Sequence, residues 1–333
     1  MSPLPVSLTE MGMPVLADEP LAGHTGLQVG GPADLFARPR TADEVSRALL
    51  AAGEEGIPVM VMGRGTNLLV GDGGIRGLVL LVGEGFEDDG VQVHGARCTV
   101  AAGVRLQSFL DRLGDVGLAG LEDLYGIPGS LGGALAMNAG AYGTEVWPRV
   151  DWVEAVLGSG ELHRYLGGEI GYGYRRADLP PGAVVVRAEF VLDEGDPREI
   201  RRRNMERMAD REAKHPLEWP NCGSVFKNFA WEPGMDLDYD KLESALGAGF
   251  SRRTLEAKGA AQLPAWRLVD ACGLTGRQIG GAQISDKHSN FMVNLGGARA
   301  ADFAALIELV EKTIEETFGF RLRTEVRRCG EFL

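Results

Sequence analysis

Cysteine and histidine are both scarce in this sequence of 333 residues. The four cysteines lie far apart and form no CxxC pair, which argues against a zinc site and against a disulfide framework. We therefore expect no bound metal and a reducing compartment. The five histidines show no spacing that suggests a Ser-His-Asp arrangement, and no GxSxG motif surrounds Ser224, so hydrolysis is a poor fit.

Long apolar runs and early basic residues are also missing. No segment approaches 18 uninterrupted apolar residues, so we expect no membrane-spanning helix. The first basic residue is Arg38, and the N-terminal stretch lacks the basic start and apolar run of a signal peptide. These features predict a cytoplasmic protein.

Basic residues are outnumbered, 34 against 47 acidic ones, which gives a net charge of -13. This charge repels phosphate backbones, so we expect no nucleic-acid partner. An anionic small molecule could still bind where backbone dipoles or a few placed cations act locally. We expect a monomer or a weak oligomer.

The chain is long enough for about two domains, and its composition, with 44% hydrophobic and 24% charged residues, is that of a folded globular protein. Strands and helices alternate over the first half, where Thr41-Ala-Asp-Glu44 reads as a capping box. A charged helix from 197 to about 214 follows, and we place the domain boundary near 195 to 215. Apolar residues at helical spacing predict a helix over 302–318, and alternation predicts a last strand over 322–328.

Glycine, by contrast, is abundant, and many of the 48 glycines gather in two loops, 63–77 and 126–143. Glycine lets backbone N–H groups turn through positive φ and approach a ligand, which is how anion-binding loops are built. Either loop alone is more simply explained as a set of tight turns. Both follow predicted strands and both contain small polar donors, so together they suggest a pyrophosphate site without the GxGxxG spacing of a Rossmann unit.

The residues of these loops resemble a known family. "GRGTNLLVGDGGIRG" (63–77) and "GIPGSLGGALAMNAGAYG" (126–143) look like the two FAD-pyrophosphate loops of the UDP-N-acetylenolpyruvoylglucosamine reductase (MurB) family. "HTGLQVGGPADLF" (24–36) resembles that family's N-terminal strand and turn, and the likeness continues to the C-terminus.

The resemblance implies an α+β fold. It consists of an FAD-binding domain of the vanillyl-alcohol-oxidase and p-cresol-methylhydroxylase type, over 20–195, and a smaller α/β substrate-binding domain, over 215–320, with strand 322–330 returning to the site. It also implies NADPH as reductant and UDP-GlcNAc-enolpyruvate as substrate, in peptidoglycan precursor synthesis. The FAD-binding residues implied by the match are Gly63, Arg64, Gly65, Thr66, Asn67, Gly126, Ile127, Pro128, Gly129, Ser130, Gly132, Gly133 and Asn138.

Three catalytic residues follow from the resemblance. "YGYRRA" (172–177) is similar to the family's Tyr-Arg-x-Ser motif, which implies that Arg175 holds the substrate carboxylate, although Ala177 replaces the usual serine. From spacing alone, Arg175 would be a surface residue stacked on its aromatic neighbour. In "KHPLEWPNCGSVFKN" (214–228) the match makes Ser224 the proton donor, with Cys222 a packing neighbour. In "LRTEVRRCG" (322–330) the match implies that Glu325 assists in stabilising or protonating the intermediate beside the flavin, whereas alone it would be an exposed ion-paired carboxylate.

Substrate-binding residues are implied less directly: Tyr174, Lys214 and Asn228, with Lys287 and His288 as weaker candidates. Arg175 and Ser224 are only 49 positions apart, and "SDKHSNFMVN" (285–294) looks like the shorter (type II) form of the family. The segment 229–264 is longer than that form usually shows, and its aromatic and leucine content predicts a small ordered element.

Two other functions remain open from the sequence. One is an oxidase on the same FAD scaffold, although the loops offer no His or Cys at a plausible tether position. The other is a non-enzymatic nucleotide-sugar binder in which the glycine loops are merely turns.

Overall fold

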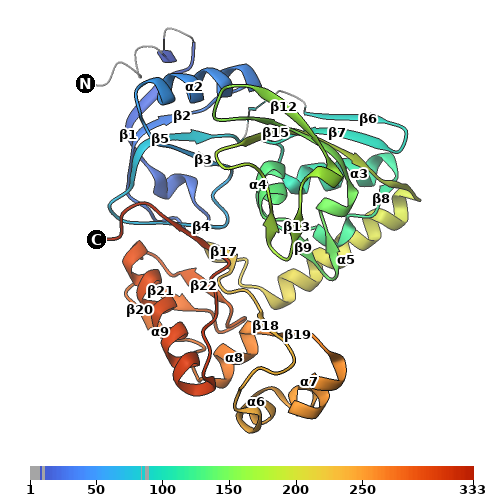
Figure 1. Ribbon diagram of the computed structural model, residues 1–333, viewed down its shortest axis with the longest axis vertical. Helices are drawn as coiled ribbons and strands as arrows, with labels where there is room; N and C mark the ends of the chain where they lie inside the picture. Colours follow the sequence, from blue (N-terminus) through green and yellow to red (C-terminus); the bar gives the residue numbers. More distant parts are fainter. Residues whose placement is uncertain (1–7, 10–11, 84, 87–89) are drawn as a thin grey trace. The chain divides into compact units, whose positions relative to one another are not determined.

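The computed structural model in Figure 1 describes residues 8–9, 12–83, 85–86 and 90–333. The chain divides into two compact units. Unit 1 consists of Met1–Pro20, Pro32–Gly65 and Ile75–Ala213, and unit 2 of Leu21–Gly31, Thr66–Gly74 and Lys214–Leu333. With the boundary expected near 195–215, the segments Leu21–Gly31 and Thr66–Gly74 would belong to the first domain. In the structure they belong to unit 2.

The two larger sheets in the described residues of unit 1 have four and five strands. The first has the strand order β1-β2-β5-β3, in which β1 is antiparallel to β2 and the other neighbours are parallel. The second is fully antiparallel, in the order β12-β11-β15-β7-β6. The strands are β1 (Val15–Pro20), β2 (Pro32–Ala37), β3 (Val59–Met62), β5 (Ile75–Leu81), β6 (Val91–His94), β7 (Arg97–Ala101), β11 (Val150–Val156), β12 (Leu162–Leu166) and β15 (Val184–Val191).

The described residues of unit 1 include the helices α2 (Ala42–Glu54), α3 (Leu106–Val116), α4 (Leu131–Ala136) and α5 (Pro197–Lys214), whose last residue falls in unit 2. The sequence predicts where α2, α3 and α5 lie, but it does not predict α4. At the start of α2 the Thr41 hydroxyl accepts a hydrogen bond from the backbone N–H of Glu44, as expected of a cap. The Glu44 carboxylate accepts from the backbone N–H of Arg40 rather than of Thr41. The expected capping box is therefore only half formed.

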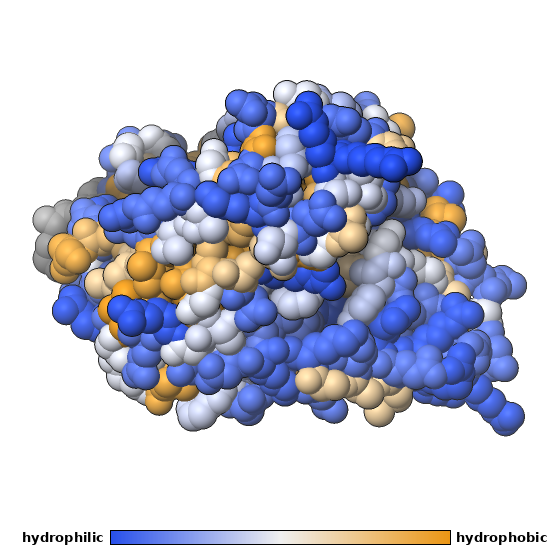
Figure 2. Space-filling model, turned by 90° about the horizontal axis from the view of Figure 1, so that it is seen from below, coloured by the Kyte–Doolittle hydropathy of each residue, from blue (hydrophilic) through white to orange (hydrophobic). Residues whose placement is uncertain are grey.

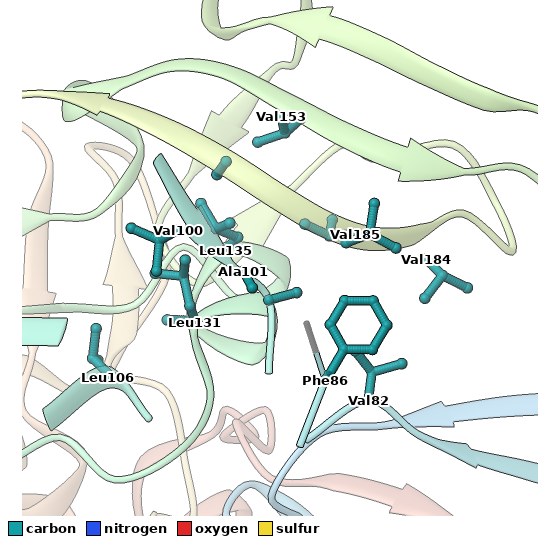
Figure 3. Packing of buried hydrophobic residues seen from close by; sticks show 14 of the residues in the cluster. Val82, Phe86, Val100, Ala101, Leu106, Leu131, Leu135, Val153, Val184 and Val185 are labelled. Atoms are coloured by element: carbon teal, nitrogen blue, oxygen red, sulfur yellow. The ribbon is translucent and has the colours of Figure 1, made fainter. Parts of the chain in front are cut away.

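One hydrophobic core holds unit 1 together. Figure 3 shows Leu131 and Leu135 of α4 beside Val100 and Ala101 of β7, with Val185 of β15 on the strand next to β7. Leu131, Leu135 and Val100 are all fully buried. Burial of such side chains supplies roughly 25 cal/mol per Å² of apolar surface. This packing anchors α4, which lies within the second glycine loop.

Unit 1 also contains short strands and 3₁₀ turns that connect its larger elements. They are the strands β8 (Leu118–Ala119), β9 (Gly140–Ala141), β10 (Thr144–Glu145), β13 (Tyr172–Gly173), β14 (Arg176–Ala177) and β16 (Asp193–Glu194), and the 3₁₀ turns η2 (Glu122–Leu124), η3 (Trp147–Arg149) and η4 (Gly167–Glu169). Strands β9 and β10 form one small hairpin, and β13 and β14 form another.

Unit 2 is built around an antiparallel sheet in the order β17-β22-β21-β20. The long helix α9 (Ala300–Phe318) buries Phe303, Leu306 and Val310 in a second core, as its apolar spacing predicts. The other elements are η1 (Leu21–His24), β4 (Leu68–Val70), β17 (Asn221–Ser224), α8 (Ala265–Ala271), β20 (Gln278–Ile279), β21 (Ala282–Ile284), β22 (Phe291–Asn294) and β23 (Arg327–Cys329).

The C-terminal strand is shorter than the alternating pattern predicts. Instead of 322–328, only β23 is a strand, and it pairs in parallel with β4. Residues 323–326 lie beside residues 225–227 through a bridge between Thr324 and Phe226 and a few further backbone hydrogen bonds. Glu325 therefore precedes the strand instead of lying within it.

Segment 229–264 is ordered, as its composition predicts. It begins with β18 (Phe229–Trp231) and ends with β19 (Ala261–Leu263), and these two strands pair. Between them lie α6 (Tyr239–Leu246), η5 (Ala248–Phe250) and α7 (Arg252–Lys258). Trp231 and Leu242 are fully buried in the unit 2 core, so the segment is part of that unit's folded body.

Most of the surface seen in Figure 2 is hydrophilic, and its hydrophobic residues form small areas rather than one continuous face. Among the described residues, no helix is both long and apolar enough to cross a membrane.

Candidate functional site

The second glycine loop, 126–143, is fixed to the helix that precedes it. The backbone N–H of Gly126 donates to the side chain of Gln107 at 2.9 Å, and the carbonyl of Gly129 accepts from the backbone N–H of Leu106 at 3.1 Å. Gly126 and Gly129 have φ values of 82° and 129°, where side chains of L-residues are strained. The loop therefore requires glycine at these two positions, as a ligand-cradling turn does.

The two glycine loops meet within unit 1. A Cβ atom on Gly63 would clash with the hydroxyl oxygen of Ser130, so a side chain there would displace that hydroxyl. Ser130 is only 2% exposed, and its hydroxyl accepts from the backbone N–H of Gly133 at 3.4 Å, which caps α4. This close approach of the first loop to a side chain of the second loop fits a cradle for a pyrophosphate. The hydrogen bond of Ser130 is thus made within the second loop, which it stabilises.

Asn67 of the first loop acts within unit 2. Its side-chain amide donates to the backbone carbonyl of Glu325 at 3.1 Å, and its own backbone carbonyl accepts from the backbone N–H of Arg327 at 3.0 Å. Asn67 thus holds the backbone that carries a predicted catalytic carboxylate.

Arg175 lies at the tip of the β13–β14 hairpin, in unit 1. The hairpin contains two residue pairs, Tyr172 with Ala177 and Gly173 with Arg176, and Arg175 has a φ of 54°. A non-glycine residue in this region carries backbone strain of about 1–3 kcal/mol, which is often found at functional sites. The Arg175 guanidinium carbon lies 5.0 Å from the centre of the Tyr174 ring, so the stacking contact expected from spacing is present.

Ser224 and Glu325 lie on neighbouring backbones of unit 2. Ser224 ends β17, and the carbonyl of the next residue, Val225, accepts from the backbone N–H of Glu325 at 2.7 Å. Both residues are partly exposed. Residues separated by about 100 positions are thereby brought to one short stretch of paired backbone, which the sequence could suggest only through the family resemblance.

Cys222 is unsuited to nucleophilic chemistry. Its side chain is 5% exposed and lies in the core of unit 2. Burial raises the pKa of the Cys222 thiol to about 12, so the thiol stays protonated at neutral pH. The structure therefore supports its interpretation as a packing residue.

Asn290 holds the Ser224 segment and was missed by the sequence analysis. The amide of this residue, which is 5% exposed, accepts from the backbone N–H of Phe226 at 3.0 Å and donates to the Phe226 carbonyl at 2.9 Å. It lies within "SDKHSNFMVN", but nothing in its spacing marks it out.

The residues predicted to bind the substrate differ in burial and in the groups that they contact. Asn228 accepts a hydrogen bond from the backbone N–H of Ala265 at 3.1 Å, at the start of α8. His288 packs against His215 and Phe291, with ring centres 5.4 and 5.0 Å away. Burial lowers the pKa of His288, which favours a neutral imidazole. Tyr174 and Lys214 are both exposed.

Comparisons with known proteins show which families the two halves of the chain resemble. Residues 33–165 match a family model described as an FAD binding domain, and residues 215–329 match one described as the C-terminal domain of UDP-N-acetylenolpyruvoylglucosamine reductase. Proteins named UDP-N-acetylenolpyruvoylglucosamine reductase are similar to this chain over nearly its whole length. The one from Geobacter metallireducens is 41% identical over 95% of this chain and 94% of its own, and the one from Paracoccus denitrificans is 43% identical over 93% and 94%.

A crystal structure of the enzyme of that name from Thermus caldophilus has a TM-score of 0.72 and 33% identity. The match covers 95% of this chain and 98% of that chain. The fold and the matched models define a flavin-dependent oxidoreductase with an FAD-binding domain and a distinct C-terminal domain, which confirms the predicted fold class. At about 40% identity over nearly its whole length, the chain belongs to the UDP-N-acetylenolpyruvoylglucosamine reductase (MurB) family.

The predicted function and cofactors are confirmed with the family. The protein is an FAD- and NADPH-dependent reductase of peptidoglycan precursor synthesis. An oxidase and a non-enzymatic binder, the two alternatives left open by the sequence, do not fit this family.

Proposed function

We propose that Arg175, Ser224 and Glu325 carry the reduction of the enolpyruvyl group of UDP-GlcNAc-enolpyruvate to give UDP-N-acetylmuramate. Bound FAD, reduced by NADPH, supplies the hydride. Addition of hydride to the terminal carbon of the enol ether leaves negative charge on the adjacent carbon and the carboxylate. Arg175 holds that carboxylate, and one such stabilising donor is worth about 3 kcal/mol.

Ser224 then gives its proton to the charged carbon, with Glu325 assisting. A placed proton donor contributes roughly 10²–10⁴ in rate. The observation that carries this assignment is the backbone hydrogen bond of 2.7 Å between Val225 and Glu325, because it puts the residue after Ser224 beside the proposed carboxylate partner. Glu325, in its protonated form, then returns a proton to Ser224, so that the serine hydroxyl is restored.

For the cofactor we propose the two glycine loops. The contact between Gly63 and Ser130 supports a pyrophosphate-binding role for Gly63, Arg64, Gly65 and Thr66 of the first loop. In the second loop we propose Gly126, Ile127, Pro128, Gly129, Gly132 and Gly133. Ser130 shapes this loop, since its hydroxyl caps α4.

For the substrate we propose Tyr174, Lys214, Asn228 and His288. Tyr174 stacks against Arg175, and His288 presents a partly buried neutral ring. We also propose the domain division read from the sequence, with FAD bound by 20–195 and substrate by 215–320. The spacing of 49 positions between Arg175 and Ser224 supports the shorter form of the family. Because its substrates are a UDP-sugar and NADPH, we propose that the enzyme acts in the cytoplasm, as a monomer or weak oligomer.

The test is Ser224→Ala in single-turnover experiments. We expect the purified variant to be yellow and its flavin to be reduced by NADPH at the wild-type rate. Reoxidation of the reduced enzyme by UDP-GlcNAc-enolpyruvate should slow by about 10²–10⁴-fold. Ser251→Ala, a change at another partly buried serine of unit 2, is the matched control and should leave both steps unchanged. Reoxidation of Ser224→Ala at the wild-type rate would remove Ser224 from the mechanism.

A further inference from the structure

We propose that Asn138 is a positioning residue, which holds the β13–β14 hairpin and thereby fixes where the Arg175 guanidinium lies. This inference rests on the proposed role of Arg175. It differs from the role that the family resemblance implied for Asn138, which was direct binding of FAD.

The hairpin needs an external support. It contains only two residue pairs, and an isolated two-stranded hairpin is marginal in water even when it is longer. Its tip carries the positive φ of Arg175, which adds strain. Tyr172, at its base, is 42% exposed. The position of the tip must therefore be set by contacts that the hairpin makes with residues outside it.

Asn138 makes such a contact, and its side chain is fully committed to the protein. One amide hydrogen is donated to the backbone carbonyl of Gly173 in β13 at 2.9 Å, and the other to the carboxylate of Glu145 at 3.0 Å. The amide oxygen accepts from the backbone N–H of Trp147 at 3.4 Å. Asn138 is 0% exposed, so these hydrogen bonds are shielded from water, and no donor is left for a ligand.

The hairpin has a second contact, between Tyr172 and Trp147, and Trp147 is itself bound to Asn138. The Trp147 indole stacks on the Tyr172 ring, with centres 6.1 Å apart and planes at 13°, and its N–H donates to the carbonyl of Leu135 in α4 at 2.8 Å. Because Trp147 also donates its backbone N–H to Asn138, both supports of the hairpin pass through one buried cluster.

The guanidinium itself passes close to this cluster. A Cβ atom on Gly140 would lie 3.4 Å from one terminal nitrogen of Arg175 and 3.0 Å from Cγ of Glu145. Gly140 follows Asn138 by two positions, and its lack of a side chain leaves the space that the Arg175 side chain uses. The segment 138–145 therefore supports the hairpin and borders its functional side chain.

The test uses Asn138→Gly in the full-length flavoprotein. Asn138 has a φ of 42°, which glycine adopts without strain, so this change deletes the amide and leaves the backbone conformation accessible. We expect normal FAD content and normal reduction by NADPH, with reoxidation by substrate slowed by about 10–100-fold, since a misplacement of about 1 Å can cost 10² in rate. If Asn138→Gly folds poorly, Tyr172→Leu replaces it in the test. This change removes the stacking on Trp147 at an exposed position, and we expect it to slow reoxidation in the same way.

A mutant cycle with Arg175→Lys separates positioning from general damage. If Asn138 acts through Arg175, adding Asn138→Gly to Arg175→Lys should slow reoxidation by less than about threefold more. Asn204→Ala removes a comparably buried amide from α5, 3% exposed, and should lower the melting temperature without slowing reoxidation.

Each contrary result has a distinct meaning. Loss of FAD from Asn138→Gly, or full additivity with Arg175→Lys, would overturn the positioning role while leaving Arg175 in the mechanism. Wild-type reoxidation by Arg175→Lys and Arg175→Ala would overturn the proposed role of Arg175, and the positioning inference with it.

Discussion

Asp72 lies in the first glycine loop, yet its carboxylate caps a helix of unit 2. One oxygen accepts from the backbone N–H of Ala300 and the other from that of Ala301, both at 2.9 Å, at the start of α9. The first N–H groups of a helix have no partner within it, and the helix dipole favours a negative charge there. The cap therefore connects two segments that lie 228 and 229 positions apart in the sequence.

We expect Asp72→Ala to destabilise unit 2 by about 2–3 kcal/mol. Loss of an ordinary cap costs about 0.5–2 kcal/mol. Asp72 makes two charge-assisted hydrogen bonds instead of one, and its side chain is only 17% exposed, so water replaces them poorly. Asp72→Asn keeps one acceptor but loses the charge, and should cost about 1 kcal/mol.

Hydrogen exchange read by mass spectrometry on peptides from α9 measures this effect locally. A loss of about 2 kcal/mol corresponds to roughly 30-fold faster exchange of amides that exchange by opening of the unit. Asp238→Ala is the control, because Asp238 caps a different helix, α6, through a hydrogen bond of 3.1 Å to the backbone N–H of Lys241, and its side chain is exposed. Exchange in α9 that is no faster in Asp72→Ala than in the Asp238→Ala control would refute the reasoning.

Three further predictions concern charge and protonation. Burial alone would raise the pKa of Glu154, but hydrogen bonds from Arg164 and Arg187 outweigh it and lower that pKa. Stability from Glu154 is therefore present above the unfolded pKa of about 4.5 and is lost as pH falls below it. Glu154→Gln should cost about 2 kcal/mol in urea unfolding at pH 7, the value being modest because both arginines are about half exposed, and the difference from wild type should shrink by pH 3. A constant difference would contradict this. Burial lowers the pKa of His288, so the stability that its neutral ring contributes is fully present above about pH 6.5 and is lost as pH falls toward the folded pKa. His288→Gln should therefore make the melting temperature depend less on pH between pH 7 and pH 5. An unchanged pH profile of the melting temperature would argue against this. Iodoacetamide at pH 8 should label Cys222 only after unfolding, as judged by peptide mass, because burial raises its pKa to about 12; rapid labelling of the native enzyme would refute its interpretation as a packing residue.

Local sequence signals predicted the regular elements well. Apolar residues at helical spacing predicted the long C-terminal helix, which is found over 300–318 and ends at Gly319 with a φ of 80°. The aromatic and leucine content of 229–264 likewise predicted an ordered element, and Trp231 is fully buried there. Prediction was poorer for 322–328, where alternation indicated a strand but backbone pairing gives a strand only over 327–329.

The candidate site shows the limit of such signals. The motifs around Arg175, Ser224 and Glu325 could be matched to a family, but their neighbours could not be found in the same way. Asn67 and Asn138 were assigned to FAD by their place in the glycine loops. In the structure their amides bind the backbone at Glu325 and at Gly173. An asparagine can donate to a ligand or to a carbonyl, and spacing along the chain does not distinguish the two.

The sequence by itself determined the family, the two glycine-rich loops and the amphipathic helices, because each depends on a motif or on the order of neighbouring residues. Only the tertiary structure decided which distant backbones meet. It joined segments 21–31 and 66–74 to the C-terminal unit, gave Asp72 a helix to cap, and placed Glu325 beside Val225. The physical reason is that buried donors and acceptors must find partners wherever the folded chain brings them together, whatever their separation in sequence.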